Sequence, residues 1–289
     1  MEEGVPVREV KDLQQVGEDV QEVKNNVDLS RSKQKIPSIT ILVVEDNRDM
    51  RKFIRSILVK EYHVIEAESG LEALDILSQP ENDINFIISD LMMPVMDGLE
   101  FSKRIKNDIK TSHIPLLILT AKTSYEKRLE SYKVGVEEYL TKPFDEDLLL
   151  VRIENILKNR RQYQHSFSIN MDVSTLHVEE DSRDKKFMDR VMMVLAENYQ
   201  EADFEVSKFA EAVGVSKTLL NRKLRDLTGE STNNFIKAYR LNKAKELILI
   251  NKVTKNLNIS EVAYEVGFND PKYFAKCFNQ KFGILPSKL

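Results

Sequence analysis

The stretch IISDLMMPVMDG (Ile87 to Gly98) decides the fold of the first half of this chain. An apolar run leads directly into one acid, Asp90, and a Met-Met-Pro sequence follows it. Such a run is typical of a buried parallel strand that presents a single charge at its carboxyl end. Ligands of open α/β sheets bind at that end, so Asp90 is a candidate functional residue. Asp97 and Gly98 are interpreted as a turn that leads into the next helix.

Outward from this stretch, short apolar runs alternate with amphipathic segments. The predicted strands are 39–44, 63–67, 85–89, 115–120 and 137–141. The predicted helices are 47–60, 70–78, 99–107, 125–134 and 145–160. Five strands alternating with five helices predict a parallel sheet covered on both faces, joined by right-handed crossovers. The expected fold is therefore an α/β, flavodoxin-like, doubly wound (βα)5 domain.

The length and composition point to a globular protein of about two domains. The chain has 289 residues, of which 42% are hydrophobic and 31% are charged. No apolar run reaches the roughly 20 residues that span a bilayer, and the polar N-terminus is no secretory signal. The lone cysteine, Cys277, excludes an intrachain disulfide and fits a reducing cytoplasm. No membrane contact is expected from this segment.

The charge is unevenly distributed along the chain. Residues 204–289 hold 15 Lys and Arg against 8 Asp and Glu, a net charge of +7, whereas the whole chain carries −4 and the remainder therefore −11. A basic half predicts nucleic acid as its partner. The predicted division is a linker or leader at 1–38, an α/β domain at 39–160, a linker at 161–182 and an all-helical domain at 183–289.

Polar side chains follow four of the predicted strands. Glu45 and Asp46 come after the first strand, Asp90 after the third, Thr120 ends the fourth and Lys142 follows the fifth. Crowded carboxylates need a cation, and hard oxygen ligands favour Mg²⁺, which also bridges to phosphate oxygens. An aspartate beside such an ion can attack phosphorus and form an acyl phosphate. Asp90 is therefore the predicted phosphoryl acceptor, with Glu45 and Asp46 as metal ligands.

The motifs VVED, ISDLMMPVMDG, ILTAK and YLTKPF, in this order and spacing, make residues 39–160 resemble a response-regulator receiver domain. The resemblance implies that Asp90 is phosphorylated. It implies that Glu45, Asp46, Asp90 and the backbone carbonyl of Met92 hold Mg²⁺, that Thr120 and Lys142 contact the phosphoryl group, and that Tyr139 is the switch aromatic. The bond before Pro143 is often cis in this family. Glu45 stands where Asp is commoner, a conservative change.

The basic half contains a repeated helix-turn-helix pattern. In 210–229 a helix, a turn at Gly214 and a second helix capped by Ser216 follow one another. The pattern recurs in 258–283, and the helix predicted at 235–250 joins the two units. Exposed Asn and Arg near the start of a recognition helix suit base edges in a major groove.

This half resembles the AraC-type DNA-binding domain over residues 183–289, most strongly in ISEVAYEVGFNDPKYFAKCFNQKFGILPS. By position, the resemblance implies base contacts from Thr218, Asn221 and Arg222 in the first unit and from Lys272, Tyr273 and Lys276 in the second. For any one Lys or Arg, a solvated helix face is an equal alternative. The chain ends before the Arg-containing tail usual in this family, as a fragment would.

Together these features predict a transcription regulator switched by phosphorylation. A histidine kinase would phosphorylate Asp90, and dimerisation through residues 122–158 or domain release would allow promoter binding. The sequences of the motifs, the polar N-terminal segment and the AraC-type tail resemble the C-terminal part of a hybrid two-component sensor. This resemblance implies a kinase in the same polypeptide and a parent protein anchored in the inner membrane. The alternative is a free-standing cytoplasmic regulator with a kinase in trans.

Two further functions compete with this one. An aspartyl-phosphate phosphatase uses similar chemistry, but it needs a second acid two residues after the nucleophile, where this chain has Met92. A phosphoryl sink without DNA binding is the other, and the two helix-turn-helix patterns argue against it.

Overall fold

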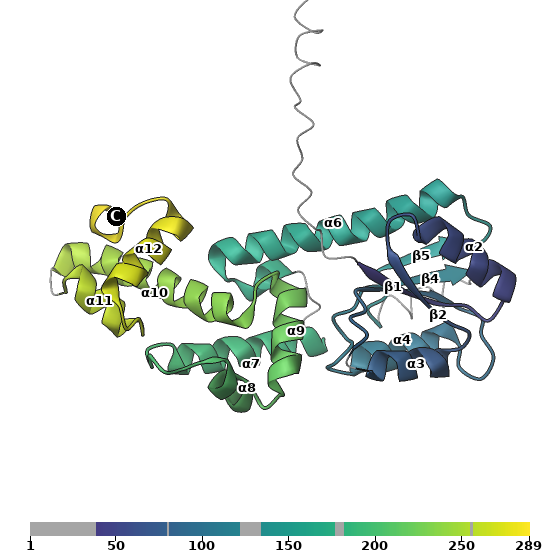
Figure 1. Cartoon of the computed structure of the whole chain (residues 1–289), viewed down its shortest axis with the longest axis horizontal. Coiled ribbons are helices and arrows are strands. Elements are labelled where there is room, and N and C mark those ends of the chain that lie inside the picture. Colours follow the sequence, from purple (N-terminus) through teal and green to yellow (C-terminus); the bar gives the residue numbers. More distant parts are fainter. Residues whose placement is uncertain (1–38, 80, 122–133, 177–181, 255–256) are drawn as a thin grey trace, which may run out of the picture. The chain divides into compact units, whose positions relative to one another are not determined.

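The computed structural model describes residues 39–79, 81–121, 134–176, 182–254 and 257–289. Figure 1 shows a twisted sheet with helices on both faces, and then a region that contains helices alone. The leader predicted at 1–38 lies outside the described residues. So does the helix predicted at 125–134, except for its last residue.

The sheet has the predicted doubly wound topology. Its strands are β1 (Thr40–Val44), β2 (His63–Ala67), β3 (Phe86–Asp90), β4 (Leu116–Thr120) and β5 (Glu138–Thr141). They pair in the order β2-β1-β3-β4-β5, and every pairing is parallel. This is the strand order of flavodoxin-like folds, in which the order reverses at β1 and β3 and a ligand binds at that switch point. The predicted fold class is confirmed.

Alternate residues of the strands build two cores, one on each side of the sheet. Leu42, Ile87 and Ile118 face α3 (Gly70–Ser78) and α4 (Gly98–Asn107). Their neighbours Val43, Ile88 and Leu117 face the opposite side. There they pack against α2 (Arg48–Leu58) and the first half of α6 (Glu146–Asn170). Because successive side chains of a strand point to opposite faces, an almost continuously apolar strand fills both layers.

Helix α6 is longer than the sequence predicted. It runs from Glu146 to Asn170, through ten residues of the segment expected as a linker, and the short 3₁₀ helix η1 (Val173–Leu176) follows it. The extension has a tertiary cause: Phe167 is 1% exposed and stacks on Phe235, with ring centroids 5.9 Å apart. The second half of α6 thereby joins the core of the C-terminal domain.

The C-terminal domain is all-helical in its described residues, as predicted. Its elements are α7 (Arg183–Asn198), α8 (Val206–Val213), α9 (Lys217–Thr228), α10 (Thr232–Thr254), α11 (Ile259–Glu265), α12 (Pro271–Phe282) and η2 (Pro286–Lys288). Two separate clusters form its core, one around α7, α8 and α9 and one around α11 and α12, and α10 contributes to both. None of the described helices combines the length and the apolar composition needed to cross a bilayer.

Candidate functional site

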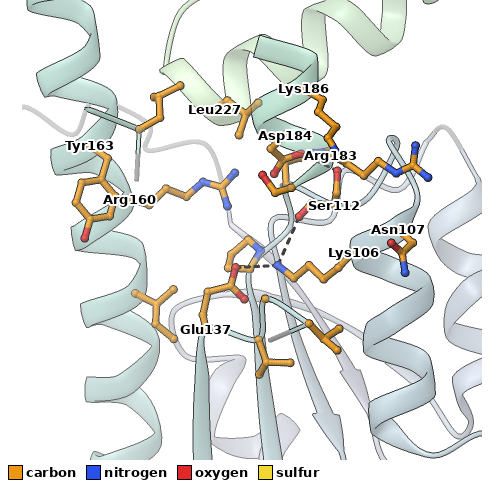
Figure 2. A pocket seen from close by; sticks show the side chains of 18 of the residues that line it. Lys106, Asn107, Ser112, Glu137, Arg160, Tyr163, Arg183, Asp184, Lys186 and Leu227 are labelled. Atoms are coloured by element: carbon orange, nitrogen blue, oxygen red, sulfur yellow. Dashed lines mark hydrogen bonds and ion pairs between the residues drawn. The ribbon is translucent and has the colours of Figure 1, made fainter. Parts of the chain in front are cut away.

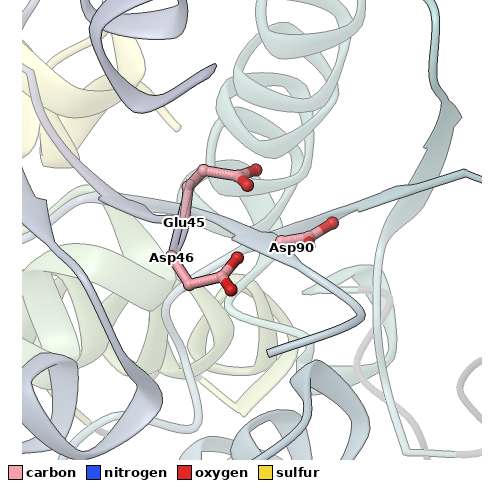
Figure 3. Close-up of side chains that lie close together, drawn as sticks. All are labelled: Glu45, Asp46 and Asp90. Atoms are coloured by element: carbon pink, nitrogen blue, oxygen red, sulfur yellow. The ribbon is translucent and has the colours of Figure 1, made fainter. Parts of the chain in front are cut away.

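The predicted acids meet at the carboxyl edge of the sheet. Asp90 is the last residue of β3, and Glu45 and Asp46 directly follow β1, which pairs with β3. Each of the three offers a carboxylate oxygen, and these oxygens lie within 4.8 Å of one another. Figure 3 shows the three side chains converging on one space from the ends of the two strands. The parallel register brings them together, because β1 and β3 end at the same edge.

Lys142 completes this group. Its Nζ donates to Glu45 Oε2 at 2.7 Å and to Asp90 Oδ1 at 2.8 Å. Burial raises the pKa of Glu45, with a further contribution from the Asp90 charge, although the hydrogen bond from Lys142 opposes this shift. Burial would lower the pKa of Lys142, but its hydrogen bonds to Asp90 and Glu45 outweigh burial and raise it. Lys142 is therefore charged and partly neutralises two carboxylates.

The donor set fits a hard divalent cation. Glu45 and Asp90 are buried, whereas Asp46 is exposed, so the cluster opens to solvent on one side. Three carboxylates and one ammonium leave net negative charge in a small space, and Mg²⁺ accepts such oxygen ligands while keeping several waters. Met92 lies two residues beyond β3, and its side chain is exposed.

The two other predicted residues lie on the neighbouring strands. Thr120 ends β4 and is buried, and no described residue is a hydrogen-bond partner of its Oγ1. An unsatisfied buried hydroxyl at the rim is a donor available to a bound anion. Tyr139 pairs with Ile118 across β4 and β5 and is buried on the side of α3 and α4. The peptide bond between Lys142 and Pro143 is cis, as the sequence resemblance implied.

The first helix-turn-helix unit forms as predicted, but one of its candidate base contacts is occupied. Gly214 ends α8 with φ of 81°, and the Ser216 side chain caps α9 by accepting from Leu219 N–H. Thr218 is exposed and Asn221 is half-buried. Arg222 instead donates from Nη2 to the carbonyl of Lys110, in the α/β domain, at 3.0 Å.

The second unit leaves all three of its candidate residues exposed. They are Lys272, Tyr273 and Lys276, on α12. The unit is well defined locally: Asn258 and Glu261 form a capping box at the start of α11, and the Asp270 side chain caps α12. The turn at Gly267 is restricted to glycine, because φ is 81° and a Cβ would lie 2.5 Å from the carbonyl oxygen of Tyr199.

Two structurally central residues had no assigned role in the sequence. Lys223 of α9 is fully buried and bonds Asp184 Oδ1 at 2.5 Å, and His113 Nε2 lies 3.0 Å from Asp226 Oδ2. His113, Ser112 and Asp184 also line a cavity of about 980 Å³ between the α/β domain and α6 and α7, shown in Figure 2. No local pattern predicts these contacts, because each joins residues far apart in the sequence.

Comparison with known families assigns each domain. Residues 41–154 match the response regulator receiver domain, and residues 209–289 match a helix-turn-helix domain. A solved structure, Vibrio cholerae chemotaxis protein CheY4, is 34% identical with a TM-score of 0.39 and covers 41% of this chain and 98% of that one.

Curated relatives include both large kinases and single receivers. Histidine kinase P4 of Formosa agariphila is 39% identical over 249 residues, which is 86% of this chain and 18% of that protein. Sensor histidine kinase TmoS of Ectopseudomonas mendocina is 38% identical and covers 40% of this chain and 12% of that protein. The chain thus spans less than a fifth of the length of these kinases.

A smaller relative, covered over almost its whole length, shows the family to which the chain belongs. A chemotaxis protein CheY homolog of Campylobacter jejuni is 35% identical over 119 residues, which is 40% of this chain and 91% of that protein. With that receiver match and the helix-turn-helix match behind it, the chain belongs to the response regulators, with a receiver domain followed by an AraC-type DNA-binding domain.

Proposed function

We propose that this chain accepts a phosphoryl group on Asp90 and, in response, changes how its two helix-turn-helix units bind promoter DNA. The observation that carries the proposal is the convergence of Glu45, Asp46, Asp90 and Lys142 at one sheet edge, in a chain whose C-terminal half presents two recognition helices. A receiver followed by a DNA-binding domain fits a regulator rather than an enzyme.

The transfer needs little from the protein besides position and charge. An oxygen of Asp90 attacks the phosphorus of a phosphohistidine, a P–O bond forms, and the P–N bond breaks so that the histidine leaves with the electron pair and takes up a proton. Lys142 Nζ, already 2.8 Å from Asp90, is placed to neutralise charge on the transferred group, and the Thr120 hydroxyl supplies a donor. Mg²⁺ held by Glu45, Asp46, Asp90 and the Met92 carbonyl would supply the remaining positive charge.

The residue two positions after Asp90 separates this function from a phosphatase. Met92 stands there, and its thioether cannot act as a general acid. The phosphoryl sink is disfavoured by the exposed residues of α12, because a sink does not need the two positive charges of Lys272 and Lys276 beside exposed Tyr273.

We further propose that the chain is the C-terminal output part of a hybrid sensor. The match to Formosa agariphila histidine kinase P4 runs through both domains and covers a small share of that protein, as expected if a kinase precedes them. Phosphorylation would then occur in cis, with the receiver and DNA-binding domains in the cytoplasm below a parent anchored in the inner membrane. A free-standing regulator phosphorylated in trans is the alternative.

Dimerisation would use the predicted surface at 122–158. Residues 122–133 lie outside the described part of the chain, but β5 and the first half of α6 are described. Leu148 and Val151 of α6 are 40% and 49% exposed, respectively. Exposed apolar side chains on one helix suit a self-complementary C2 contact.

Phosphorylation of the full chain by acetyl phosphate and Mg²⁺ tests the acceptor assignment. Intact-mass spectrometry should show one added phosphoryl group in the wild type and none in Asp90→Ala. Asp97→Asn is the matched control, because Asp97 is an exposed acid of the same motif that only caps α4. Undiminished uptake by Asp90→Ala would refute the acceptor assignment.

A further inference from the structure

The recognition helix of the first unit, α9, is held by the receiver. Lys223 lies at the centre of this contact: its Nζ donates to the Ile109 carbonyl at 2.9 Å, to Ser112 Oγ at 2.8 Å and to Asp184 Oδ1 at 2.5 Å. Ser112 Oγ in turn donates to Asp184 Oδ1 at 2.6 Å. Three segments thus meet at one ammonium: α9, the start of α7, and the receiver turn 108–113 that connects α4 to β4.

This contact is a buried polar network rather than a surface ion pair. Lys223 is fully buried, and the Asp184 side chain is 11% exposed. Burial lowers the pKa of Lys223, although the charge and hydrogen bond of Asp184 oppose this. Burial alone would raise the pKa of Asp184, but the charge and hydrogen bond of Lys223 oppose burial, and the pKa is lowered. A buried pair with its hydrogen bonds satisfied fixes the geometry, because losing one partner leaves an uncompensated charge.

The receiver also contacts two side chains on the side of α9 that faces away from its own domain core. Arg222 donates to the Lys110 carbonyl at 3.0 Å, and Arg225 Nη2 lies 3.2 Å from Asp83 Oδ2. Positions 218, 222 and 225 lie on one stripe of a helix. That stripe contains Thr218 and Arg222, two of the three residues expected to contact bases in the first unit. Two cationic side chains of this stripe, Arg222 and Arg225, are thus already paired with a carbonyl and a carboxylate of the receiver.

The receiver turn is directly connected to the proposed phosphorylation site. It follows α4, whose first residue Gly98 donates its N–H to the Leu91 carbonyl, next to Asp90, at 2.8 Å. It precedes β4, whose last residue is Thr120. One short element thus links each side of the phosphorylation site to the turn: α4 runs from Gly98 to the turn, and β4 runs from the turn to Thr120. A displacement of Thr120 or of the start of α4 would therefore reach the turn through a single element.

We propose that turn 108–113 and Asp83 form a docking surface for α9 that competes with DNA, and that phosphorylation of Asp90 opens this contact. The inference rests on the proposed function and names how the receiver regulates it. The occupant is this chain's own α9, since its side chains already make these hydrogen bonds. The receiver backbone at Lys110 lies against the Arg222 guanidinium and so competes with a base edge for the same side chain.

Variants on the receiver side test this without altering the DNA-binding surface. Ser112→Tyr places a large side chain against Lys223 and Asp184, and Asp83→Lys sets a positive charge beside exposed Arg225. The probe is a fluorescein-labelled duplex selected from a randomised pool by the phosphorylated wild type. Unphosphorylated Ser112→Tyr should bind it about tenfold more tightly than unphosphorylated wild type, within the usual range of coupling between sites. Asp83→Lys should bind severalfold more tightly, and Ser56→Tyr, an exposed control on α2, should not differ.

The outcomes separate the two proposals. If the phosphorylated wild type binds the probe but neither Ser112→Tyr nor Asp83→Lys gains affinity without phosphate, the competition is overturned while the proposed function stands. Asp83→Lys decides the matter if Ser112→Tyr does not fold, because Asp83 is exposed. If no form binds duplex DNA at low salt, the proposed function itself falls. Amide hydrogen exchange in 217–228 should also rise on phosphorylation, and unchanged exchange would count against opening of the contact.

Discussion

Single residues at the sheet edge were the most predictable part of the molecule. Glu45, Asp46, Asp90 and Lys142 each follow a predicted strand, and parallel strands bring such positions to one edge whatever the details of packing. The structure brings them together, with Lys142 within hydrogen-bond distance of two of the acids. The sequence could not show that Lys142 bridges Glu45 and Asp90, because that depends on side-chain geometry across β1, β3 and β5.

Asp46 provides a test of the metal site at this scale. It is the exposed member of the cluster, so replacing it should remove a metal ligand with little effect on packing. Asp46→Ala should weaken Mg²⁺ binding by at least about tenfold, since ligand loss exceeds the effect of outer-shell changes. Calorimetric titration with MgCl₂ measures this directly, and Asp49→Ala, an exposed acid at the start of α2, is the control. Equal affinities for wild type and Asp46→Ala would exclude Asp46 as a ligand.

At the scale of elements, apolar periodicity predicted the strands and most helices, and tertiary packing decided the rest. The second half of α6 is polar along most of its length and was expected to be a linker. It is helical because Phe167 stacks on Phe235, 68 positions later in the chain, and a periodicity argument does not include such a partner. The helix starts carry favourable N-cap residues: Asn47, Ser69, Ser216 and Asp270 each accept a backbone N–H, and the cap at Ser216 was predicted from the sequence.

The start of α4 should be unusually sensitive to substitution. A Cβ on Gly98 would lie 2.3 Å from the Asp90 carbonyl oxygen, whereas a Cβ on Gly70, at the start of α3, would meet the flexible Met96 side chain at 2.9 Å. Gly98→Ala should therefore lower the free energy of unfolding by about 1–3 kcal/mol, as overpacking does, and Gly70→Ala by less. Urea denaturation followed by circular dichroism compares them. A Gly70→Ala loss as large as that of Gly98→Ala would show that backbone proximity is not the cause.

At the scale of the whole described molecule, the contact between the two domains is what the sequence did not predict. Lys223 bonds the Ile109 carbonyl and Ser112, and His113 lies beside Asp226, across elements that no motif connects. In the family resemblance, Arg222 was a base contact, but here it bonds the receiver. Residue type and spacing describe each domain separately, so a regulatory contact between domains becomes visible only in the folded chain.

This contact should make stability depend on pH through His113. The side chain is buried against Asp226, with Lys223 and Arg160 nearby, and burial lowers its pKa despite the opposing effect of the Asp226 carboxylate 3.0 Å away. His113 is therefore neutral when folded, while in the unfolded chain it binds a proton with a pKa of about 6.5. The unfolded chain then takes up more protons as the pH falls, so the contribution is complete above about pH 6.5 and is lost below it.

The expected loss from His113 is at most about 1.4 kcal/mol for each pH unit below that value. Thermal unfolding of the full chain at pH 7.5 and pH 5.5 should show a larger decrease in Tm for wild type than for His113→Gln, which has no proton to gain. His63→Gln is the control, because His63 lies at the start of β2 with its side chain exposed. Since both variants remove one histidine, a decrease of the wild-type size in His113→Gln would locate the pH dependence elsewhere, whereas a smaller decrease assigns it to the buried pair between the receiver and α9.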